Sequence, residues 1–512
     1  MNIADLALNN IDEFGEYDQL FWRDLKYTNK QMLLEARKLA AALKERGVKK
    51  DDRVAIVLGN RPEAIMSFLA CAWLGAWATS VQFLLMPSEI GYVLDHSETT
   101  VVITQQLWLN KVLEAKPRAP RIEHVILIDP PDEYDEEQFL SFPDIIEKAD
   151  PEIECESTDE DDVAFMIYTA GTTGTPRGVM LTHLNIISNT EASVAALRFQ
   201  TSEATLCALP LYHAYGIMTY FCGYLYGARS VLMSWFQPEE SLSLIEQHKI
   251  ANASLVPTML IQMLKLPYHA DYDTSTMERW ICAAAPLSVD IMQKFEAAFG
   301  GKVYEGYGLT EAGPAVSINR HAMPAKPGSI GLPLPGVEVE IRDLRNTPLP
   351  MNRKGEICVS GPNIMKGYFK DEDATNETVR EGWLHTGDAG YLDEDGYLFI
   401  TERIKDVIIR GGENIFPEDI EKVLLEHPDI SETSVVGFKD ELYGEEVMAI
   451  VVPKPKADLT EEMVLEFCEG RLAKFQRPKK IIIAPMLPKN PLGKVLKRKL
   501  RQQYGEKTGS ME

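Results

Sequence analysis

A loop rich in glycine and threonine follows an apolar, strand-like run at residues 163–168. Residues 168–178 read Tyr-Thr-Ala-Gly-Thr-Thr-Gly-Thr-Pro-Arg-Gly. Glycines let the backbone approach a ligand and turn its N–H groups inward. The threonine hydroxyls add neutral donors, and Arg177 can form paired hydrogen bonds with a phosphate. The segment predicts a polyphosphate-binding loop, although it lacks the Gly-Lys-Ser/Thr end of a Walker A loop; the alternative is a Gly/Thr-rich surface turn.

Two further segments carry groups suited to a nucleotide. In 304–313, Tyr307 lies between glycines and can stack on a purine, while Thr310 and Glu311 offer oxygens to phosphate and to a hard metal ion. A carboxylate that faces a triphosphate implies Mg²⁺ between them. Asp388 follows Thr-Gly and can accept both hydroxyls of a ribose. Taken singly, each segment could also be a glycine-bearing turn.

The last two segments are strongly charged. Residues 401–417 are a charged run that breaks into the pair Gly411-Gly412, and 488–499 place Lys494 within a basic stretch. Residues 471–505 hold eleven Lys and Arg and no acid, in a chain with a net charge of −25. Such a segment can bring cations to an anionic small molecule, or it can be a solvated basic helix end. The overall acidity argues against a nucleic-acid or anionic-membrane partner.

The length and composition indicate a globular protein with at least two domains. The chain has 512 residues, 45% of them hydrophobic and 25% charged. Its acidic start gives no sign of a signal peptide. The uncharged stretch 64–86 is long enough to cross a bilayer, but Gly75 divides it into an amphipathic helix and a buried strand, so we expect no transmembrane segment. Seven scattered cysteines favour reduced thiols and a cytoplasmic location.

The order of helix-like and strand-like runs predicts an α/β fold. Helical patterns at 29–46 and 62–74 alternate with strand patterns at 53–58 and 101–104, which is typical of layered α/β structure. From about residue 327, short runs separated by Gly and Pro predict a small β-barrel or sheet. We therefore expect a large N-terminal domain, 1–402, of layered α/β subdomains plus a small β-barrel, followed by a small mobile α+β domain, 403–512.

In order and spacing, these five segments resemble the adenylate-forming superfamily of acyl-CoA synthetases, luciferases and peptide-synthetase adenylation domains. The resemblance covers nearly the whole chain, from the turn at 58–63 to Lys494. It implies ATP, Mg²⁺ and coenzyme A as the reaction's small molecules, with a carboxylic acid as substrate. Two positions depart from the usual pattern: Ala170 replaces a serine and Arg177 replaces a lysine. We expect adenylation to survive both changes, with an altered KM for ATP.

The resemblance also implies roles for individual residues. Tyr307 would stack on adenine, Glu311 would hold Mg²⁺, and Asp388 with Arg403 would bind the ribose. Lys494 would bridge the substrate carboxylate and the α-phosphate. The residues implied to contact ATP or coenzyme A are Thr169, Gly171, Thr172, Thr173, Gly174, Thr175, Arg177, Gly178, Ala285, Gly306, Tyr307, Gly308, Thr310, Asp388, Arg403, Lys405, Gly411, Gly412 and Lys494; those implied in catalysis are Lys494, Glu311, Thr310 and His213.

By the same resemblance, the reaction has two halves served by one mobile domain. Lys405 occupies the hinge about which the C-terminal domain rotates after adenylation. The rotation withdraws Lys494 and brings the Gly411-Gly412 loop up to form a channel for a thiol, which displaces AMP to give a thioester.

The acid pocket is predicted from two apolar segments. Residues 209–216 resemble the family segment whose histidine gates the acid site, here His213, although a core histidine is the alternative. Ala283 and Ala284 replace glycines common in fatty-acid enzymes and would shorten an acyl tunnel. Neither segment carries a charged residue, so we expect an apolar acid. His183 is expected to be structural.

The leading expectation is a fatty-acid–CoA ligase acting on a medium- or long-chain acid. An aryl-acid–CoA ligase is the nearest alternative, because 355–361 resembles a segment of 4-coumarate ligases. An acyl-AMP ligase that loads a carrier protein, a degenerate ATP-binding protein and an oxidative luciferase are more distant ones. We expect a cytoplasmic monomer or homodimer, with peripheral attachment to a membrane left open.

Overall fold

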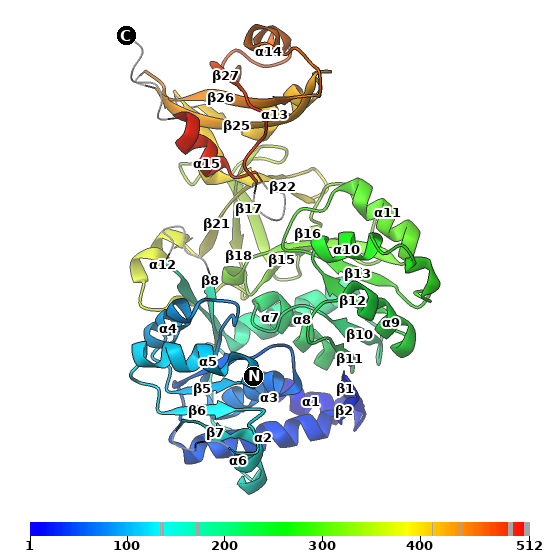
Figure 1. The fold of residues 1–512 in the computed structure, drawn as a ribbon, viewed down its shortest axis with the longest axis vertical. Helices are drawn as coiled ribbons and strands as arrows, with labels where there is room; N and C mark the ends of the chain where they lie inside the picture. The colour runs from blue at the N-terminus through cyan, green and yellow to red at the C-terminus, as the bar shows by residue number, and fades with distance from the viewer. Residues whose placement is uncertain are drawn as a thin grey trace. The chain divides into compact units, whose positions relative to one another are not determined.

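The computed structural model describes residues 1–133, 135, 138–169, 175–411, 413–440, 442–489 and 495–505. The chain divides into two compact units (Figure 1). The large unit comprises Met1–Glu340, Cys358–Thr386 and Glu394–Leu398, and the small unit comprises Ile341–Ile357, Gly387–Asp393 and Phe399–Glu512. The residue bounds predicted for the two domains stay a prediction.

An eight-stranded sheet organises the first part of the large unit, with the strand order β19-β9-β8-β4-β3-β5-β6-β7. Its central strands are short, rich in β-branched residues and parallel to one another, as expected for strands buried on both faces. The strands are β3 (Arg53–Val57), β4 (Trp77–Ser80), β5 (Val101–Thr104), β6 (His124–Leu127), β7 (Leu140–Ser141), β8 (Val163–Thr169), β9 (Arg177–Thr182) and β19 (Gly367–Tyr368). The accompanying helices are α1 (Ile3–Phe14), α2 (Asn29–Glu45), α3 (Pro62–Leu74), α4 (Pro87–His96), α5 (Gln106–Ala115), α6 (Phe142–Lys148) and α12 (Glu372–Thr378), with a 3₁₀ turn at Lys116–Arg118.

The uncharged stretch 64–86 forms the predicted helix and strand, but the helix is buried on all its faces and is not the amphipathic helix expected. Helix α3 begins with Pro62 and ends at Gly75, whose left-handed backbone (φ 65°) caps it before strand β4. No helix in the described part of the chain is long and apolar enough to cross a membrane. All seven cysteines are free.

A nine-stranded sheet forms the second part of the large unit, in the order β16-β15-β14-β13-β12-β10-β11-β1-β2. Helices α9 (Pro238–His248), α10 (Pro257–Leu264) and α11 (Val289–Phe299) pack apolar side chains against strands β10 to β14, and Figure 1 shows them beside these strands. The strands are β1 (Asp18–Trp22), β2 (Leu25–Thr28), β10 (Ala204–Cys207), β11 (Arg229–Leu232), β12 (Asn252–Leu255), β13 (Arg279–Cys282), β14 (Lys302–Gly308), β15 (Ala315–Ile318) and β16 (Leu332–Pro333). The remaining helices here are α7 (His183–Leu197) and α8 (Ala214–Leu225), with 3₁₀ turns at His269–Asp271 and Thr310–Ala312.

A small curled sheet confirms the β-rich region expected after residue 327. It has the order β17-β18-β21-β20, and β22 also pairs with β21. Its strands are β17 (Glu338–Arg342), β18 (Gly355–Ser360), β20 (Val379–Arg380), β21 (Trp383–Leu392) and β22 (Leu398–Arg403).

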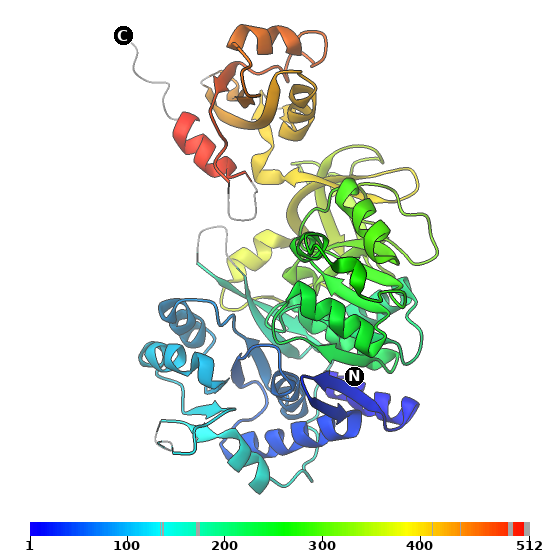
Figure 2. The same ribbon diagram turned by 45° about the vertical axis from the view of Figure 1, so that its right-hand side comes forward.

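The C-terminal part of the small unit is a five-stranded sheet with helices on it (Figure 2). The strand order is β24-β23-β26-β25, and β27 lies parallel to β26. Along β25 and β26 alternate residues face opposite sides, so one side packs on α13 and α14 and the other on α15. The elements are the 3₁₀ turn Ile404–Asp406, β23 (Ile408–Arg410), β24 (Glu413–Ile415), α13 (Pro417–Leu425), β25 (Ile430–Asp440), β26 (Gly444–Pro453), α14 (Glu461–Cys468), β27 (Lys480–Ile483), α15 (Lys497–Leu500) and a π-helical turn at Arg501–Gly505. The α/β class with a large and a small part is confirmed.

Candidate functional site

Strands β8 and β9 hold the two ends of the predicted phosphate loop. They pair antiparallel, with Thr169 opposite Arg177. The hydroxyl of Tyr168 lies 2.7 Å from Nδ1 of His96, and the hydroxyl of Tyr92 donates to the carbonyl of Pro176 at 3.1 Å. Both stems of the loop are therefore fixed by side chains of helix α4. The predicted residues Ala170, Gly171, Thr172, Thr173 and Gly174 lie outside the described residues.

The carboxylate of Glu311 lies beside this hairpin. Its Oε1 accepts a hydrogen bond from the hydroxyl of Tyr368 at 3.0 Å and one from Oγ1 of Thr169 at 3.5 Å. The backbone carbonyl of Glu311 accepts from the N–H of Met365. The structure thus brings together two predicted site residues, Thr169 and Glu311, next to Thr310. Carboxylate oxygens are the ligands that Mg²⁺ prefers, so this group fits a magnesium site.

Tyr368 was not predicted from the sequence, and it connects Glu311 to the cation of the loop. The guanidinium carbon of Arg177 lies 5.2 Å from the centre of the Tyr368 ring, and its Nε lies 3.1 Å from Asp371. Burial raises the pKa of the Tyr368 phenol, and the charge of Glu311 raises it further. The phenol therefore stays protonated and donates to Glu311.

The segment predicted to face the adenine forms the end of strand β14. Gly308 lies directly against the carbonyl of Pro314, so a side chain there would clash. Tyr307 is buried, with 9% of its surface exposed. Gly306, Tyr307, Gly308 and Thr310 all line the cavity described next.

A cavity of about 290 Å³ lies in the large unit, close to the lower limit for ligand pockets. His213, Ala283 and Ala284 line it, as the sequence predicts. Burial lowers the pKa of His213, so its imidazole is neutral near pH 7. None of the described residues that line the cavity is an acid, a lysine or an arginine. The lining also includes Ser193, Leu197, Phe199, Thr205, Tyr215, Met218, Thr219, Cys222, Tyr226, Ser254, Ile281 and Ser317.

Sequence reasoning missed most of the cavity wall. Phe199 and Thr205 come from a segment that carries no motif. The positions Tyr215, Thr219, Cys222 and Tyr226 recur at helical spacing along α8. This helical spacing could have predicted that these four side chains line one face of the pocket.

In the small unit, the predicted ribose-binding pair is formed. Asp388 is buried, and its Oδ1 lies 2.7 Å from Nε of Arg403, which is half exposed. The carbonyl of the predicted hinge residue Lys405 accepts a hydrogen bond from Arg501 at 3.4 Å. A side chain at Gly411 would approach the ring of Tyr443 within 3.1 Å. Gly412 and Lys494 lie outside the described residues.

A carboxyl group close to the hinge is buried in the small unit. The side chain of Glu402 is 7% exposed, and Nζ of Lys497 lies 3.9 Å from it and 3.0 Å from Glu421. Neither carboxyl oxygen of Glu402 has a donor with good hydrogen-bond geometry among the described residues, although the backbone N–H of Glu418 lies near enough to favour the carboxylate weakly. Burial raises the pKa of Glu402 to about 8, against the opposing charge of Lys497.

His183 has a structural environment, as expected. It is buried, and its Nδ1 accepts a hydrogen bond from the N–H of Ile3 at 3.2 Å. Burial lowers its pKa to about 4. The predicted site residue Ala285 is exposed and does not line the cavity.

Two family models match most of the chain. The model described as AMP-binding enzyme matches residues 9–369, and the model described as AMP-binding enzyme C-terminal domain matches residues 419–494. Among curated proteins, the chain is 35% identical to a long-chain-fatty-acid–CoA ligase of Bacillus subtilis (strain 168), over 98% of this chain and 95% of that protein. It is 34% identical to 4-coumarate:CoA ligase 1 of Petunia hybrida, over 93% and 88%. Among solved structures, ATP-bound MatB from Rhodopseudomonas palustris superposes with a TM-score of 0.83, at 29% identity over 99% of both chains.

Proposed function

Since the chain belongs to the AMP-binding enzyme family and is an AMP-forming acid–CoA ligase, we propose that its acid substrate is a medium- or long-chain fatty acid. ATP, Mg²⁺ and coenzyme A take part in the reaction. The observation that carries the proposal is the cavity lined by apolar and neutral side chains. A diacid or an amino acid would leave a charge unpaired in such a pocket, which is costly.

The reaction joins the acid to a thiol in two steps. A carboxylate oxygen attacks the α-phosphate of ATP and releases pyrophosphate, leaving an acyl-adenylate. The coenzyme A thiol then attacks the acyl carbon, loses its proton and releases AMP, leaving the thioester. In the first step two anions must meet, so positive charge fixed at the site lowers the barrier.

Each predicted residue has a task in this scheme. Lys494 neutralises the substrate carboxylate and the α-phosphate. The loop 169–178 and Thr310 bind the phosphates, and Glu311 holds Mg²⁺, which supplies charge neutralisation of the polyphosphate when bound. The hydrogen bonds from Tyr368 and Thr169 to Glu311 support that role, because they fix the carboxylate in place.

The nucleoside and the acid are held by other groups. Tyr307 stacks on the adenine, and Asp388 with Arg403 binds the ribose; their 2.7 Å ion pair supports this role because it fixes the carboxylate. His213, neutral and at the wall of the cavity, gates the acid site. For the second step, Lys405 is the hinge, and Gly411 with Gly412 leaves room for the thiol.

An aryl acid is the second candidate substrate. The 34% identity with a 4-coumarate:CoA ligase favours it, and so do the aromatic side chains of Tyr215 and Tyr226 in the cavity wall. The cavity itself is neutral and accepts either acid on grounds of charge. The acceptor in this proposal is coenzyme A, and a carrier protein is an outcome of the test below.

The test is pyrophosphate release from ATP and Mg²⁺ with acetate, C4 to C18 fatty acids, benzoate and coumarate, each with and without coenzyme A. We expect turnover that depends on coenzyme A and is greatest with aliphatic acids of eight or more carbons. The variant Lys494→Ala should lose adenylation on every acid. Turnover greatest with coumarate would contradict the fatty-acid assignment, and adenylation indifferent to coenzyme A would move it to a carrier-protein acceptor.

A further inference from the structure

The cavity follows helix α8 from one end to the other. His213, the residue before the helix, lines it, and so do Tyr215, Thr219, Cys222 and, just after the last turn, Tyr226. These positions fall on one face of the helix. At 1.5 Å per residue, the thirteen steps from His213 to Tyr226 span roughly 20 Å. The lining therefore extends along the whole helix, with His213 at the end where adenylation is proposed.

Two stacked rings close the other end. The rings of Phe199 and Tyr226 lie 4.7 Å apart at an angle of 16°, and both line the cavity. Tyr226 is buried, whereas Phe199 is partly exposed and lies between the exposed residues Arg198 and Gln200. The pair therefore joins the cavity wall to a partly exposed position of the chain.

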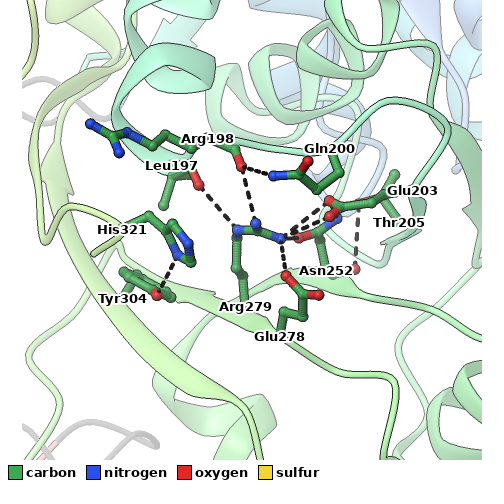
Figure 3. Close-up of polar contacts among 10 residues, drawn as sticks. All are labelled: Leu197, Arg198, Gln200, Glu203, Thr205, Asn252, Glu278, Arg279, Tyr304 and His321. Atoms are coloured by element: carbon green, nitrogen blue, oxygen red, sulfur yellow. Dashed lines mark hydrogen bonds and ion pairs between the residues drawn. The ribbon is translucent and has the colours of Figure 1, made fainter. Parts of the chain in front are cut away.

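A buried arginine fixes the backbone that carries Phe199. Arg279, on strand β13, is 0% exposed; its Nε donates to the carbonyl of Leu197 and its Nη2 to the carbonyl of Arg198, both at 3.0 Å (Figure 3). The guanidinium carbon lies 5.6 Å from the centre of the Phe199 ring. Arg198 has a left-handed backbone (φ 52°), which ends helix α7 and turns the chain toward Phe199.

The other side of the guanidinium is held as well. Nη1 donates to Glu203 at 3.2 Å and to Oδ1 of Asn252 at 3.0 Å, and Asn252 in turn donates to Glu203 (Figure 3). Because the guanidinium of Arg279 donates hydrogen bonds to several partners in a fixed planar geometry, it restricts the conformation of residues 197–203. The wall at the end of the cavity is therefore rigid, apart from the rings themselves.

We propose that the Phe199–Tyr226 pair is the stop of the acyl pocket and sets the chain length of the substrate, with Arg279 as the residue that positions Phe199. The inference rests on the proposed fatty-acid function. An extended saturated chain advances about 1.3 Å per carbon–carbon bond, and contact with the closing rings takes about 4 Å of the roughly 20 Å, so the stop admits chains of about twelve carbons. Longer chains meet the two rings.

The test is the chain-length profile of the full-length enzyme and its Phe199 variants, as kcat/KM with ATP and coenzyme A for octanoate, dodecanoate and hexadecanoate. Burying one methylene contributes a factor of about four. The wild-type enzyme should prefer dodecanoate over hexadecanoate. Phe199→Ala should raise kcat/KM for hexadecanoate at least about tenfold and change that for octanoate by less than about threefold, because only long chains reach the vacated space.

A variant that enlarges residue 199 and a control variant away from the cavity complete the test. Phe199→Trp should shift the preference toward octanoate, and Tyr268→Ala, an exposed tyrosine away from the cavity, should leave the profile unchanged. Arg279→Lys keeps the positive charge but loses the planar guanidinium that donates to both carbonyls. This variant should therefore accept a broader range of chain lengths, with an unchanged KM for ATP. Identical profiles for wild type, Phe199→Ala and Phe199→Trp, with aliphatic turnover present, would overturn this inference alone. Absence of aliphatic turnover in the wild type would overturn the proposed function with it.

Discussion

Each of the two units buries charged side chains, and Arg279 in the large unit and Glu402 in the small unit are held in opposite ways. Arg279 in the large unit donates to two backbone carbonyls, to Glu203 and to Asn252. The carboxyl of Glu402 in the small unit is also largely buried, yet within the described ranges neither of its oxygens accepts a hydrogen bond of good geometry, and the ammonium of Lys497 is 3.9 Å away.

The difference shows how burial acts on a charge. A buried ion with all its partners fixes the structure around it, and here that structure is a wall of the acid pocket. A buried carboxyl without donors is easier to protonate instead, so the segment that carries it depends on pH. Glu402 lies three residues before the proposed hinge at Lys405. We therefore expect a preformed pocket in the large unit and, in the small unit, a stability that depends on pH at the segment proposed to move.

Removing Arg279 would break the first half of this comparison and should have the largest effect. Arg279→Met leaves Glu203 largely buried without its charged partner and with the amide of Asn252 as a remaining donor, so we expect the free energy of unfolding of the large unit to fall by about 3–5 kcal/mol. Urea unfolding followed by tryptophan fluorescence measures it, since all seven tryptophans belong to the large unit. The control Arg121→Met removes an exposed ion pair with Glu98 and should cost at most about 1 kcal/mol. Equal losses for the two variants would contradict the account.

Replacing Glu402 tests the second half of the comparison, the buried carboxyl of the small unit. Its pKa is raised from 4.5 to about 8 by burial, so the folded state binds a proton that the unfolded state releases. The small unit should lose stability as pH rises from about 4.5 to about 8, by on the order of 2–4 kcal/mol. In Glu402→Gln this contribution should disappear, and the variant should be the more stable protein at pH 8.

Scanning calorimetry of the full chain at pH 6, 7 and 8 measures this difference. Glu469→Gln, which removes a mostly exposed carboxylate paired with Arg477, is the matched control and should keep the wild-type pH dependence. A Glu402→Gln variant that follows the wild type at every pH would show that the carboxyl is already ionised and partnered.

Glu311 is intermediate between Arg279 and Glu402, because its carboxylate accepts a hydrogen bond from the phenol of Tyr368. Tyr368→Phe removes a hydrogen bond to a charged group, worth about 1.5 kcal/mol. We expect the Mg²⁺ concentration for half-maximal pyrophosphate release to rise about tenfold, with kcat at saturating Mg²⁺ changed by less than about threefold. Tyr397→Phe, whose hydroxyl binds the carbonyl of Pro324, is the control. An unchanged Mg²⁺ dependence in Tyr368→Phe would remove Tyr368 from the positioning of Glu311.

Local sequence patterns predicted much of this architecture. The alternation of helix and strand, the Gly75 cap and the small curled sheet follow from the order of residue types, and the five motifs led to the correct family. The family resemblance assigned Asp388 and Arg403 to the ribose, and Thr169 and Glu311 to the ATP and Mg²⁺ site; the members of each pair lie within contact distance, and their roles stay predictions.

Contacts between distant segments were not predictable in the same way. Arg279 binds carbonyls about eighty residues earlier, and Tyr368 reaches Glu311 across 57 residues, so no local spacing reveals either. Phe199 lies in a turn without a motif, and only the folded chain places it against Tyr226. The predictions for Lys494, Gly412 and residues 170–174 concern positions outside the described residues.

One competition experiment tests the central claim most directly. The full-length enzyme receives equimolar dodecanoate and 4-coumarate with ATP, Mg²⁺ and coenzyme A, and the two thioesters are counted by mass spectrometry at early times. The neutral pocket that ends at Phe199 and Tyr226 predicts that dodecanoyl-CoA predominates. A predominance of coumaroyl-CoA would contradict the assignment to fatty acids.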